Sequence, residues 1–359
     1  MIKVAFRADG GPQMGMGHII RCLSLASEFR KQGFDVIFLS KYQEGIDRII
    51  NEKFEIFRLE STFSAVEHEQ GFHYGDMLSL EKEAGEIIKC INENCIDILV
   101  VDSYNVTHEY LLLIKKFVKI LSYIDDINKF TYPVNILING NITGEYMNYT
   151  KYYNDEIMLL GPKYNLIRNE FKNIPLRSIN RKINKIMITT GGADPYNLTC
   201  KIVEDLMEDS YFNNITFNII VGNAFTNKEE IIKMVGRYSN LILHENVKSM
   251  AKIMLDSDIA ISSGGSTLYE LCACGTPTTA IILANNQEFI VKKMDEAGYV
   301  IDLGWYNEMK KDIITKKIKQ LSENYSHRLE LCKRAIGLID GYGTERIVEV
   351  FRKYINVLL

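Results

Sequence analysis

Residues 1–40 read MIKVAFRADGGPQMGMGHIIRCLSLASEFRKQGFDVIFLS and already contain one complete strand–helix–strand unit. Ile2–Arg7 is an apolar run suited to a buried strand, and Asp35–Leu39, which follows Gly33 in the sequence, is again strand-like. The apolar residues between them recur at helical spacing, at Ile19, Ile20, Leu23, Ala26 and Phe29. This order predicts a βαβ unit, whose two strands lie parallel.

The same alternation continues along the first half of the chain. Helix-like segments at Ser79–Asn94 and His108–Phe117 precede strand candidates at Asp97–Val101 and Lys119–Ile124. Continuous apolar strands of this kind are buried on both faces. They therefore predict a parallel sheet that is covered by helices on both sides.

A second series of strands and helices begins at Lys185, beyond a polar block at 140–155 and a charged segment at 169–185. We therefore expect an α/β protein with two doubly wound domains, residues 1–181 and 182–359, that meet near Lys182. The predicted strands are Lys185–Thr190, Ile215–Val221, Leu241–His244 and Ile259–Ser262, and the predicted helices are Leu198–Asp209, Lys228–Tyr238, Val247–Leu255, Asp312–Leu321, His327–Ile339 and Thr344–Leu359.

Composition and charge exclude several classes of protein. The 42 Lys and Arg against 46 Asp and Glu give a net charge of -4, and without a basic stripe we expect no nucleic-acid partner. The N-terminus lacks the apolar core of a signal peptide, and no window of the sequence is apolar enough to span a bilayer. We therefore expect a cytoplasmic protein without a membrane span. We also expect a monomer. The seven scattered cysteines, never in CxxC spacing, predict reduced and mostly buried thiols.

The loop from Arg7 to His18, RADGGPQMGMGH, is the first candidate site. In doubly wound sheets, ligands bind outside the carboxyl ends of the strands, where such loops enter helices. His18 stands where the helix starts, and the positive end of the helix dipole disfavours an imidazolium there. The ring would then stay neutral and take a proton from water, as a general base. The alternative is a helix-capping or half-buried histidine without a catalytic part.

Two later loops follow predicted strands in the second half. Thr189–Pro195, TTGGADP, offers backbone N–H groups to a ligand or is a plain turn. Ser262–Glu270, SSGGSTLYE, offers N–H and hydroxyl donors to a diphosphate, and it lacks the lysine of an NTPase P-loop. Glu270 would accept hydrogen bonds from ribose hydroxyls, or it would form a capping box with Thr267.

No metal site is predicted. Asp125 and Asp126 follow a strand, but adjacent carboxylates there are more often turn or surface residues. His68 and His73 do not match the spacing of a helical zinc motif. The other histidines, at positions 108, 244 and 327, have no neighbouring ligand set in the sequence.

A series of ordered motifs resembles a known family. The motifs are RADGGPQMGMGHIIRCLSLA from Arg7, VDSYNV (Val101–Val106), IDDI (Ile124–Ile127), GPKYNLIRNEF (Gly161–Phe171), TTGGADP, HENV (His244–Val247), SSGGSTLYELCACGTP (Ser262–Pro277), NNQ (Asn285–Gln287) and DGYGTER (Asp340–Arg346). Together they are similar to the UDP-sugar hydrolases of pseudaminic acid biosynthesis. The order and spacing match across most of the chain.

The resemblance implies a GT-B fold, two Rossmann-like domains with UDP in the cleft between them, and neither metal nor cofactor. It implies that UDP-2,4-diacetamido-2,4,6-trideoxy-β-L-altropyranose and water react to UDP and the free sugar, with inversion at the anomeric carbon. It also implies His18 as the catalytic residue, Gly15, Gly17, Tyr104, Arg168 and Asn286 at the sugar, and Gly191, Gly192, Val247, Gly265, Ser266, Thr267 and Glu270 at UDP.

Two other functions fit the same motifs. A UDP-sugar-dependent glycosyltransferase would share the fold and the nucleotide loops, but it needs an acceptor groove, which the polar block 140–155 would line or cover. A non-catalytic sugar-nucleotide sensor would keep the loops of the second half and would have no need of His18.

Overall fold

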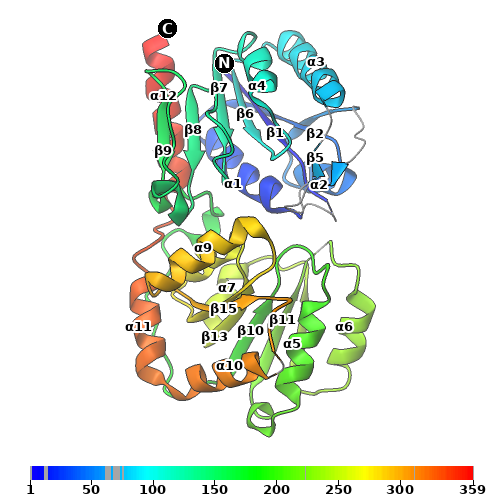
Figure 1. The fold of residues 1–359 in the computed structure, drawn as a ribbon, viewed down its shortest axis with the longest axis vertical. Coiled ribbons are helices and arrows are strands. Elements are labelled where there is room, and N and C mark those ends of the chain that lie inside the picture. Colours follow the sequence, from blue (N-terminus) through cyan, green and yellow to red (C-terminus); the bar gives the residue numbers. More distant parts are fainter. Residues whose placement is uncertain are drawn as a thin grey trace. The chain divides into compact units, whose positions relative to one another are not determined.

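The computed structural model describes residues 2–11, 15–60, 66–67, 73–74, 77–222, 224–310 and 312–358. Residue contacts divide the chain into two compact units (Figure 1). The first unit consists of Met1–Arg168 and Tyr342–Leu359, and the second unit of Asn169–Gly341. No helix in these described ranges is long and apolar enough to cross a membrane.

The first unit is built on a seven-stranded parallel sheet with the order β3-β2-β1-β6-β7-β8-β9. Its strands are β1 Lys3–Ala8, β2 Asp35–Ser40, β3 Glu55–Arg58, β6 Ile98–Asp102, β7 Ile120–Ile124, β8 Ile136–Asn139 and β9 Ile157–Leu160; β4 Val66–Glu67 and β5 His73–Tyr74 form a separate antiparallel pair. Its helices are α1 Gly17–Lys31, α2 Gln43–Asn51, α3 Met77–Asn94, α4 His108–Lys115 and α12 Gly343–Leu358.

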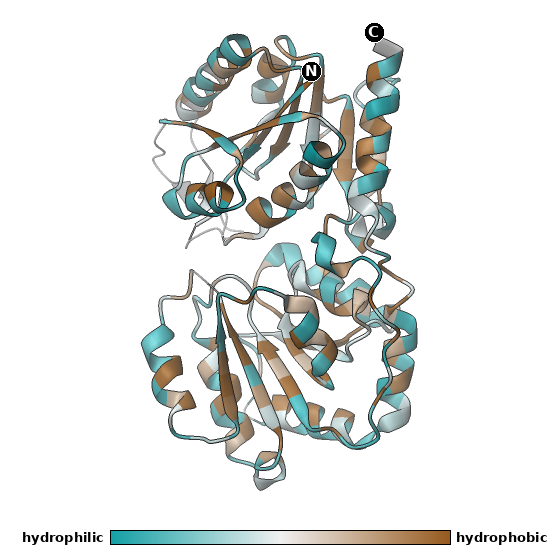
Figure 2. Ribbon diagram, turned by 180° about the vertical axis from the view of Figure 1, so that it is seen from behind, coloured by the Kyte–Doolittle hydropathy of each residue, from teal (hydrophilic) through white to brown (hydrophobic). Residues whose placement is uncertain are grey.

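Two apolar layers hold the first sheet. On one face, Phe6 packs on Phe29 of α1, and Phe29 packs in turn on Phe351 of α12. On the other face, α3 and α4 contribute residues such as Ala84 and Leu111. The strands are largely brown in Figure 2, whereas the helices carry both brown and teal faces. The amphipathic spacing of the sequence thus produces the predicted layers.

The second unit repeats the plan with a six-stranded parallel sheet in the order β12-β11-β10-β13-β14-β15. Its strands are β10 Lys185–Thr189, β11 Thr216–Val221, β12 Leu241–Glu245, β13 Ile259–Ser263, β14 Thr278–Ile282 and β15 Ile301–Trp305. Its helices are α5 Leu198–Met207, α6 Lys228–Val235, α7 Met250–Asp256, α8 Thr267–Ala273, α9 Asn285–Glu296, α10 Ile313–Glu323 and α11 Tyr325–Ala335.

The division into units differs from the predicted boundary near Lys182. The segment from Asn169 onward already belongs to the second unit, where Arg177 donates to the carbonyl of Met254 at 3.0 Å. Helix α12 returns to the first unit, because its apolar face covers α1 (Figure 1). Local periodicity predicts a helix but not the surface on which the helix packs. The predicted domain 182–359 therefore included α12, which belongs to the first unit.

Gly222 has no room for a side chain behind the predicted loop Thr189–Pro195. A Cβ atom there would lie 2.8 Å from Cα of Gly192 and closer still to its carbonyl oxygen. We expect Gly222→Ala to destabilise the second unit by about 1–3 kcal/mol, because backbone atoms must move. The fluorescence of Trp305, the single tryptophan of the chain, reports on this unit during thermal unfolding.

Gly236→Ala is the matched control for this prediction. Gly236 ends α6 with right-handed helical dihedrals, and an added Cβ would meet only ordinary contacts at 3.5 and 3.6 Å. The Gly236→Ala variant should leave the midpoint of thermal unfolding unchanged or raise it slightly. An unfolding midpoint of Gly222→Ala equal to that of Gly236→Ala would contradict the prediction.

Candidate active site

Polar side chains meet at the carboxyl edge of the first sheet. Asp102 is the last residue of β6 and is paired in register with Ala8, the last residue of β1. Asp126 follows β7 by two residues, and His18 is the second residue of α1. Because the strands are parallel, their ends lie at one edge, where the β1–α1 loop also ends. Residues from three separate parts of the sequence thus come together there.

His18 forms a close pair with Asp102. Its Nδ1 lies 2.6 Å from Oδ1 of Asp102, and its ring stands edge-on to that of Tyr104 with 4.7 Å between centroids. The His18 side chain is 13% exposed, whereas the Asp102 side chain is fully buried. Met16 is the N-cap of α1, so His18 does not cap the helix, whereas the other form of that alternative, a half-buried histidine, agrees with its exposure. An imidazole that is held by a carboxylate and is partly exposed can exchange a proton with a bound molecule.

Arg21, one turn further along α1, binds two carboxylates at once. Its Nε and Nη2 donate to the two oxygens of Asp102, each at 2.6 Å, and its Nη1 donates to Asp126 at 2.8 and 2.9 Å. Burial by itself would raise the pKa of Asp102, but Arg21 and His18 outweigh it and hold that pKa well below its usual range. Asp102 is therefore a carboxylate at neutral pH.

Asp126 connects this pair to two further loops. It accepts a hydrogen bond from the Tyr104 hydroxyl at 2.7 Å and another from the amide of Asn141 at 2.7 Å. The thiol of Cys22 donates to Asp102 at 3.4 Å. We call the group His18, Arg21, Asp102, Tyr104 and Asp126 the His18 cluster. The motifs DSY and IDDI contain Asp102 and Asp126, but nothing in the spacing of these motifs indicated which side chains the two carboxylates contact.

Asp125 and Asp126 are both buried, so they are not surface residues, but Asp125 does form a turn, as predicted, by accepting from the N–H groups of Ile127 at 3.2 Å and Asn128 at 2.6 Å. Asp125 is fully buried and accepts from the hydroxyls of Tyr132, at 2.7 Å, and Tyr149. Burial raises the pKa of Asp125 although these tyrosines and the N–H of Asn128 lower it. Among the described residues, no group of three or more His, Cys, Asp or Glu has the arrangement of a metal site.

Two glycines lie at the start of α1. Gly11 and Gly15 exchange backbone hydrogen bonds of 3.1 and 2.8 Å, and Gly15 has a φ of +74°, which favours glycine. Residues 12–14 lie outside the described part of the chain. Gly17 is exposed at the first position of α1, whose first turn contains no acidic residue. Such a helix start presents backbone N–H groups to an anionic or polar group.

The predicted nucleotide loops lie at the corresponding edge of the second sheet. Gly191 follows β10 with a φ of +104°, and Gly264 is packed so closely against α9 that an added Cβ would lie 2.5 Å from Val291. An added Cβ on Gly265 would meet nothing within 4 Å. The strands β10, β13 and β14 are neighbours, so the loops that carry Gly191, Gly265 and Asn286 begin side by side. The remaining predicted residues of this edge are Gly192, Val247, Ser266, Thr267 and Glu270.

Glu270 is buried in the first turn of α8. The N-cap of that helix is Ser266, which makes no side-chain capping bond, so Thr267 is not the cap of a capping box. At the start of α5, whose N-cap is Asn197, the N–H groups of Leu198 and Thr199 donate to the Asp194 carboxylate at 2.8 and 2.9 Å. Arg168 is half-buried at the end of the N-terminal segment of the first unit, and its part in sugar binding stays a prediction.

The other histidines and the cysteines are structural or peripheral. His108 contacts the carbonyl of Thr131, His244 bonds to Asn218, and the His327 side chain is exposed. His68 lies outside the described residues, and of His73 only its place in β5 is described. Cys95 is exposed, the other six cysteines are buried, and all seven are outside disulfides, as the sequence predicted.

A second group of charges is buried on the opposite face of β1. Glu83 of α3 accepts from Nε of Arg7 at 2.6 Å, from the hydroxyl of Tyr110 at 2.9 Å and from the ammonium of Lys41. Asp9 forms an ion pair with Arg7 at 2.6 Å and accepts from the N–H of Lys41 at 2.9 Å. We call these five residues the Glu83 cluster. It holds the first residues of the loop that leads to His18.

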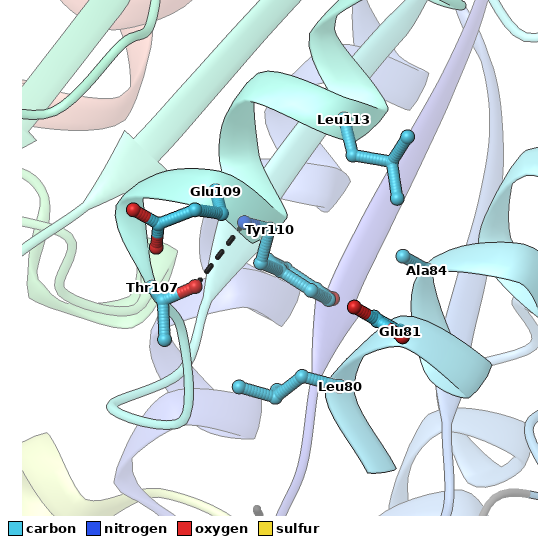
Figure 3. A pocket seen from close by; sticks show the side chains of 7 residues that line it. All are labelled: Leu80, Glu81, Ala84, Thr107, Glu109, Tyr110 and Leu113. Atoms are coloured by element: carbon cyan, nitrogen blue, oxygen red, sulfur yellow. Dashed lines mark hydrogen bonds between the residues drawn. The ribbon is translucent and has the colours of Figure 1, made fainter. Parts of the chain in front are cut away.

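An apolar cavity lies between α3 and α4, next to the Glu83 cluster (Figure 3). Its volume is about 230 Å³, and Leu80, Ala84 and Leu113 line it together with the ring of Tyr110. Thr107 caps α4 at its rim by accepting from the N–H of Tyr110 at 3.2 Å. Its lining contains none of the residues of the His18 cluster, so the cavity is not the predicted catalytic site.

Comparison with known families and proteins gives consistent matches. Residues 185–336 match the family model described as the glycosyltransferase family 28 C-terminal domain. The protein MJ1062 of Methanocaldococcus jannaschii is 30% identical over 80% of this chain, which spans only 56% of that protein. The spore coat polysaccharide biosynthesis protein SpsG of Bacillus subtilis is 24% identical over 98% of both chains. The UDP-2,4-diacetamido-2,4,6-trideoxy-β-L-altropyranose hydrolase of Campylobacter jejuni is 27% identical over 84% of this chain and 99% of its own.

Solved structures confirm the predicted GT-B fold. MurG from Acinetobacter baumannii superposes with a TM-score of 0.68, 14% identity and coverage of 98% of this chain and 100% of its own. MnaA from S. aureus in complex with UDP superposes with a TM-score of 0.69 and 13% identity, and the match covers 99% of this chain and 97% of its own. The chain therefore has the GT-B fold, carries a C-terminal domain of the glycosyltransferase family 28 type, and is a homologue of SpsG and of the altropyranose hydrolases that its motifs resemble.

Proposed function

We propose that this protein hydrolyses a UDP-linked 2,4-diacetamido-2,4,6-trideoxy sugar to UDP and the free sugar, as a step in the formation of pseudaminic acid. The observation that carries this proposal is His18, held by a buried carboxylate at the carboxyl edge of β6 with its ring partly exposed, in a chain homologous to proteins named for that reaction. Because a neutral imidazole is a general base near physiological pH, it suits the activation of water.

The reaction is a single displacement at the anomeric carbon. The oxygen of water forms a bond to C1 from the face opposite UDP, while the bond from C1 to the β-phosphate oxygen breaks and its electron pair leaves with UDP. His18 takes the proton that water loses. A single displacement inverts the configuration at C1. General-base help of this kind contributes about 10²–10⁴-fold to the rate.

We assign the predicted residues to the two partners of the reaction. Gly15, Gly17, Tyr104, Arg168 and Asn286 would bind the sugar. Val247 would face uracil with its backbone and Glu270 would bind the ribose, whose hydroxyls can donate to a buried carboxylate. The phosphates would meet Gly191, Gly192, Gly265, Ser266 and Thr267, where the space around Gly265 supports a close approach of ligand to backbone.

A UDP-sugar-dependent glycosyltransferase remains the second candidate, since glycosyltransferases are among the structures that share this fold. The two differ in the molecule that attacks C1, which is water in one and an acceptor hydroxyl in the other. Fold alone does not choose between them. We further expect the protein to act as a cytoplasmic monomer without a metal.

Incubation with the UDP-sugar in H₂¹⁸O, without any acceptor, tests the proposal. We expect UDP and free sugar in equal amounts, with ¹⁸O on C1 of the sugar and none in UDP, and a first-formed anomer of inverted configuration by NMR. The rate should not change when EDTA is added. UDP release only on addition of an acceptor would establish the glycosyltransferase, and tight UDP binding without turnover would establish the sensor.

A further inference from the structure

We propose that Asp102 is a positioning residue that keeps the proton of the neutral His18 ring on Nδ1, so that Nε2 is the nitrogen that accepts a proton during catalysis. The first half of this statement concerns the protein alone, and the second half rests on the proposed hydrolysis. Asp102 itself need not touch the substrate, because it acts through His18.

The short contact between the two side chains decides the tautomer. An ionised carboxylate is only an acceptor, so a nitrogen 2.6 Å from Oδ1 of Asp102 must carry a hydrogen. The competing arrangement would protonate Nε2 and let Nδ1 accept from Nη2 of Arg21, which lies 3.2 Å away. That arrangement would place the lone pair of Nδ1 against the carboxylate at the shorter distance. The Nδ1–H tautomer is therefore the favoured one, and the low pKa of Asp102 keeps its carboxylate ionised.

Arg21 prevents Asp102 from turning away. Its guanidinium forms a two-point contact with both oxygens of Asp102, and its third nitrogen is anchored on Asp126. Bidentate pairs of this kind fix the plane of a carboxylate. Since Asp102 has no exposed surface, water does not compete for its oxygens. The ring of His18 thus meets a carboxylate with one orientation.

The charges of the cluster also favour the state that forms during catalysis. Two carboxylates and one guanidinium leave one negative charge when His18 is neutral. When His18 takes the proton of water, the cluster becomes neutral. The helix dipole at the start of α1 acts in the opposite direction, since it disfavours imidazolium.

The tautomer is measured on the unaltered protein. In protein labelled with ¹⁵N-histidine, at a pH where His18 is neutral, long-range ¹H–¹⁵N spectra distinguish Nδ1–H from Nε2–H, and His18→Ala assigns the signal. We expect the Nδ1–H form. A dominant Nε2–H form would overturn the inference. Because no substrate is present, this result stands apart from whether the protein hydrolyses a UDP-sugar.

Asp102→Asn tests the consequence for catalysis. An asparagine amide can donate to Nδ1, which moves the proton to Nε2, so we expect a shift toward Nε2–H and a fall in kcat of about 10²-fold with KM changed by less than about threefold. Asp102→Glu, which keeps the charge, should recover part of kcat. A folded Asp102→Asn protein with the wild-type tautomer and kcat would overturn the inference.

Asp97→Asn is the matched control, because Asp97 lies at the opposite end of the same strand. Its carboxylate accepts from the N–H of Lys3 at 3.0 Å and pairs with Lys119 at 2.9 Å. It should leave the tautomer and kcat unchanged. If Asp102→Asn does not fold, the tautomer of the wild-type protein still decides the first half of the inference.

Discussion

His18→Ala lowers kcat for UDP-sugar hydrolysis by about 10²–10⁴-fold in our expectation and leaves the affinity for UDP within about twofold. The variant removes the group that takes the proton of water. The UDP-binding residues that we propose all lie in the second unit, so nucleotide affinity should depend little on His18. Steady-state kinetics give kcat and KM, and calorimetric titration gives the dissociation constant of UDP.

The matched control is His327→Ala. His327 is exposed in the first turn of α11, and only its backbone N–H has a described bond, to Asn324 at 3.0 Å. That variant should retain wild-type kcat. If His18→Ala kept more than about a tenth of the wild-type kcat, His18 would not be the general base. A large loss of UDP affinity would instead indicate that His18 binds the nucleotide.

Glu83→Gln should destabilise the first unit by about 3–5 kcal/mol. Glu83 is buried and accepts hydrogen bonds from Arg7, Lys41 and Tyr110. Loss of its charge therefore leaves the cations of Arg7 and Lys41 without their shared carboxylate. Two buried nitrogens of Arg7, Nη1 and Nη2, already have no hydrogen-bond partner in the described part of the chain, although Nη2 forms an ion pair with Asp9. Hydrogen exchange of the β1 amides reports on this unit, and Trp305 fluorescence reports on the other.

The destabilisation should depend on pH. Burial alone would raise the pKa of Glu83, but Arg7 and Lys41 outweigh it and lower the pKa from 4.5 to about 2. A depressed pKa in the folded state stabilises the protein above pH 4.5 and loses that contribution as pH falls toward about 2. The difference in stability between wild type and Glu83→Gln should therefore be full at pH 7 and shrink below pH 4.5.

Glu81→Gln, on the same helix, provides the reference for both measurements. Glu81 is exposed, so its substitution should change stability by less than about 0.5 kcal/mol at any pH. Equal exchange rates in the two variants would show that the Glu83 cluster does not stabilise the first unit.

Much of the fold could be read from local patterns. The predicted helices and strands of both halves appear within a few residues of their expected bounds, because apolar spacing specifies which face each element buries. The elements α2, α9, β3, β4, β5, β8, β9, β14 and β15 were not predicted. All of them except α9 contain nine residues or fewer, too few for periodicity to stand out beside the segments around them. Helix α9 has 12 residues and was missed although it is longer.

The sequence by itself determined the two series of parallel strands, the loops that follow them and the place of His18 at the head of α1. Only the tertiary structure decided what His18 faces. Its partner Asp102 is 84 residues away, and Arg21 meets Asp126 across 105 residues. These contacts exist because β6 lies beside β1 in the sheet, with β2 and β3 on the other side. Strand order depends on how all the apolar faces pack together, and no local pattern contains that information.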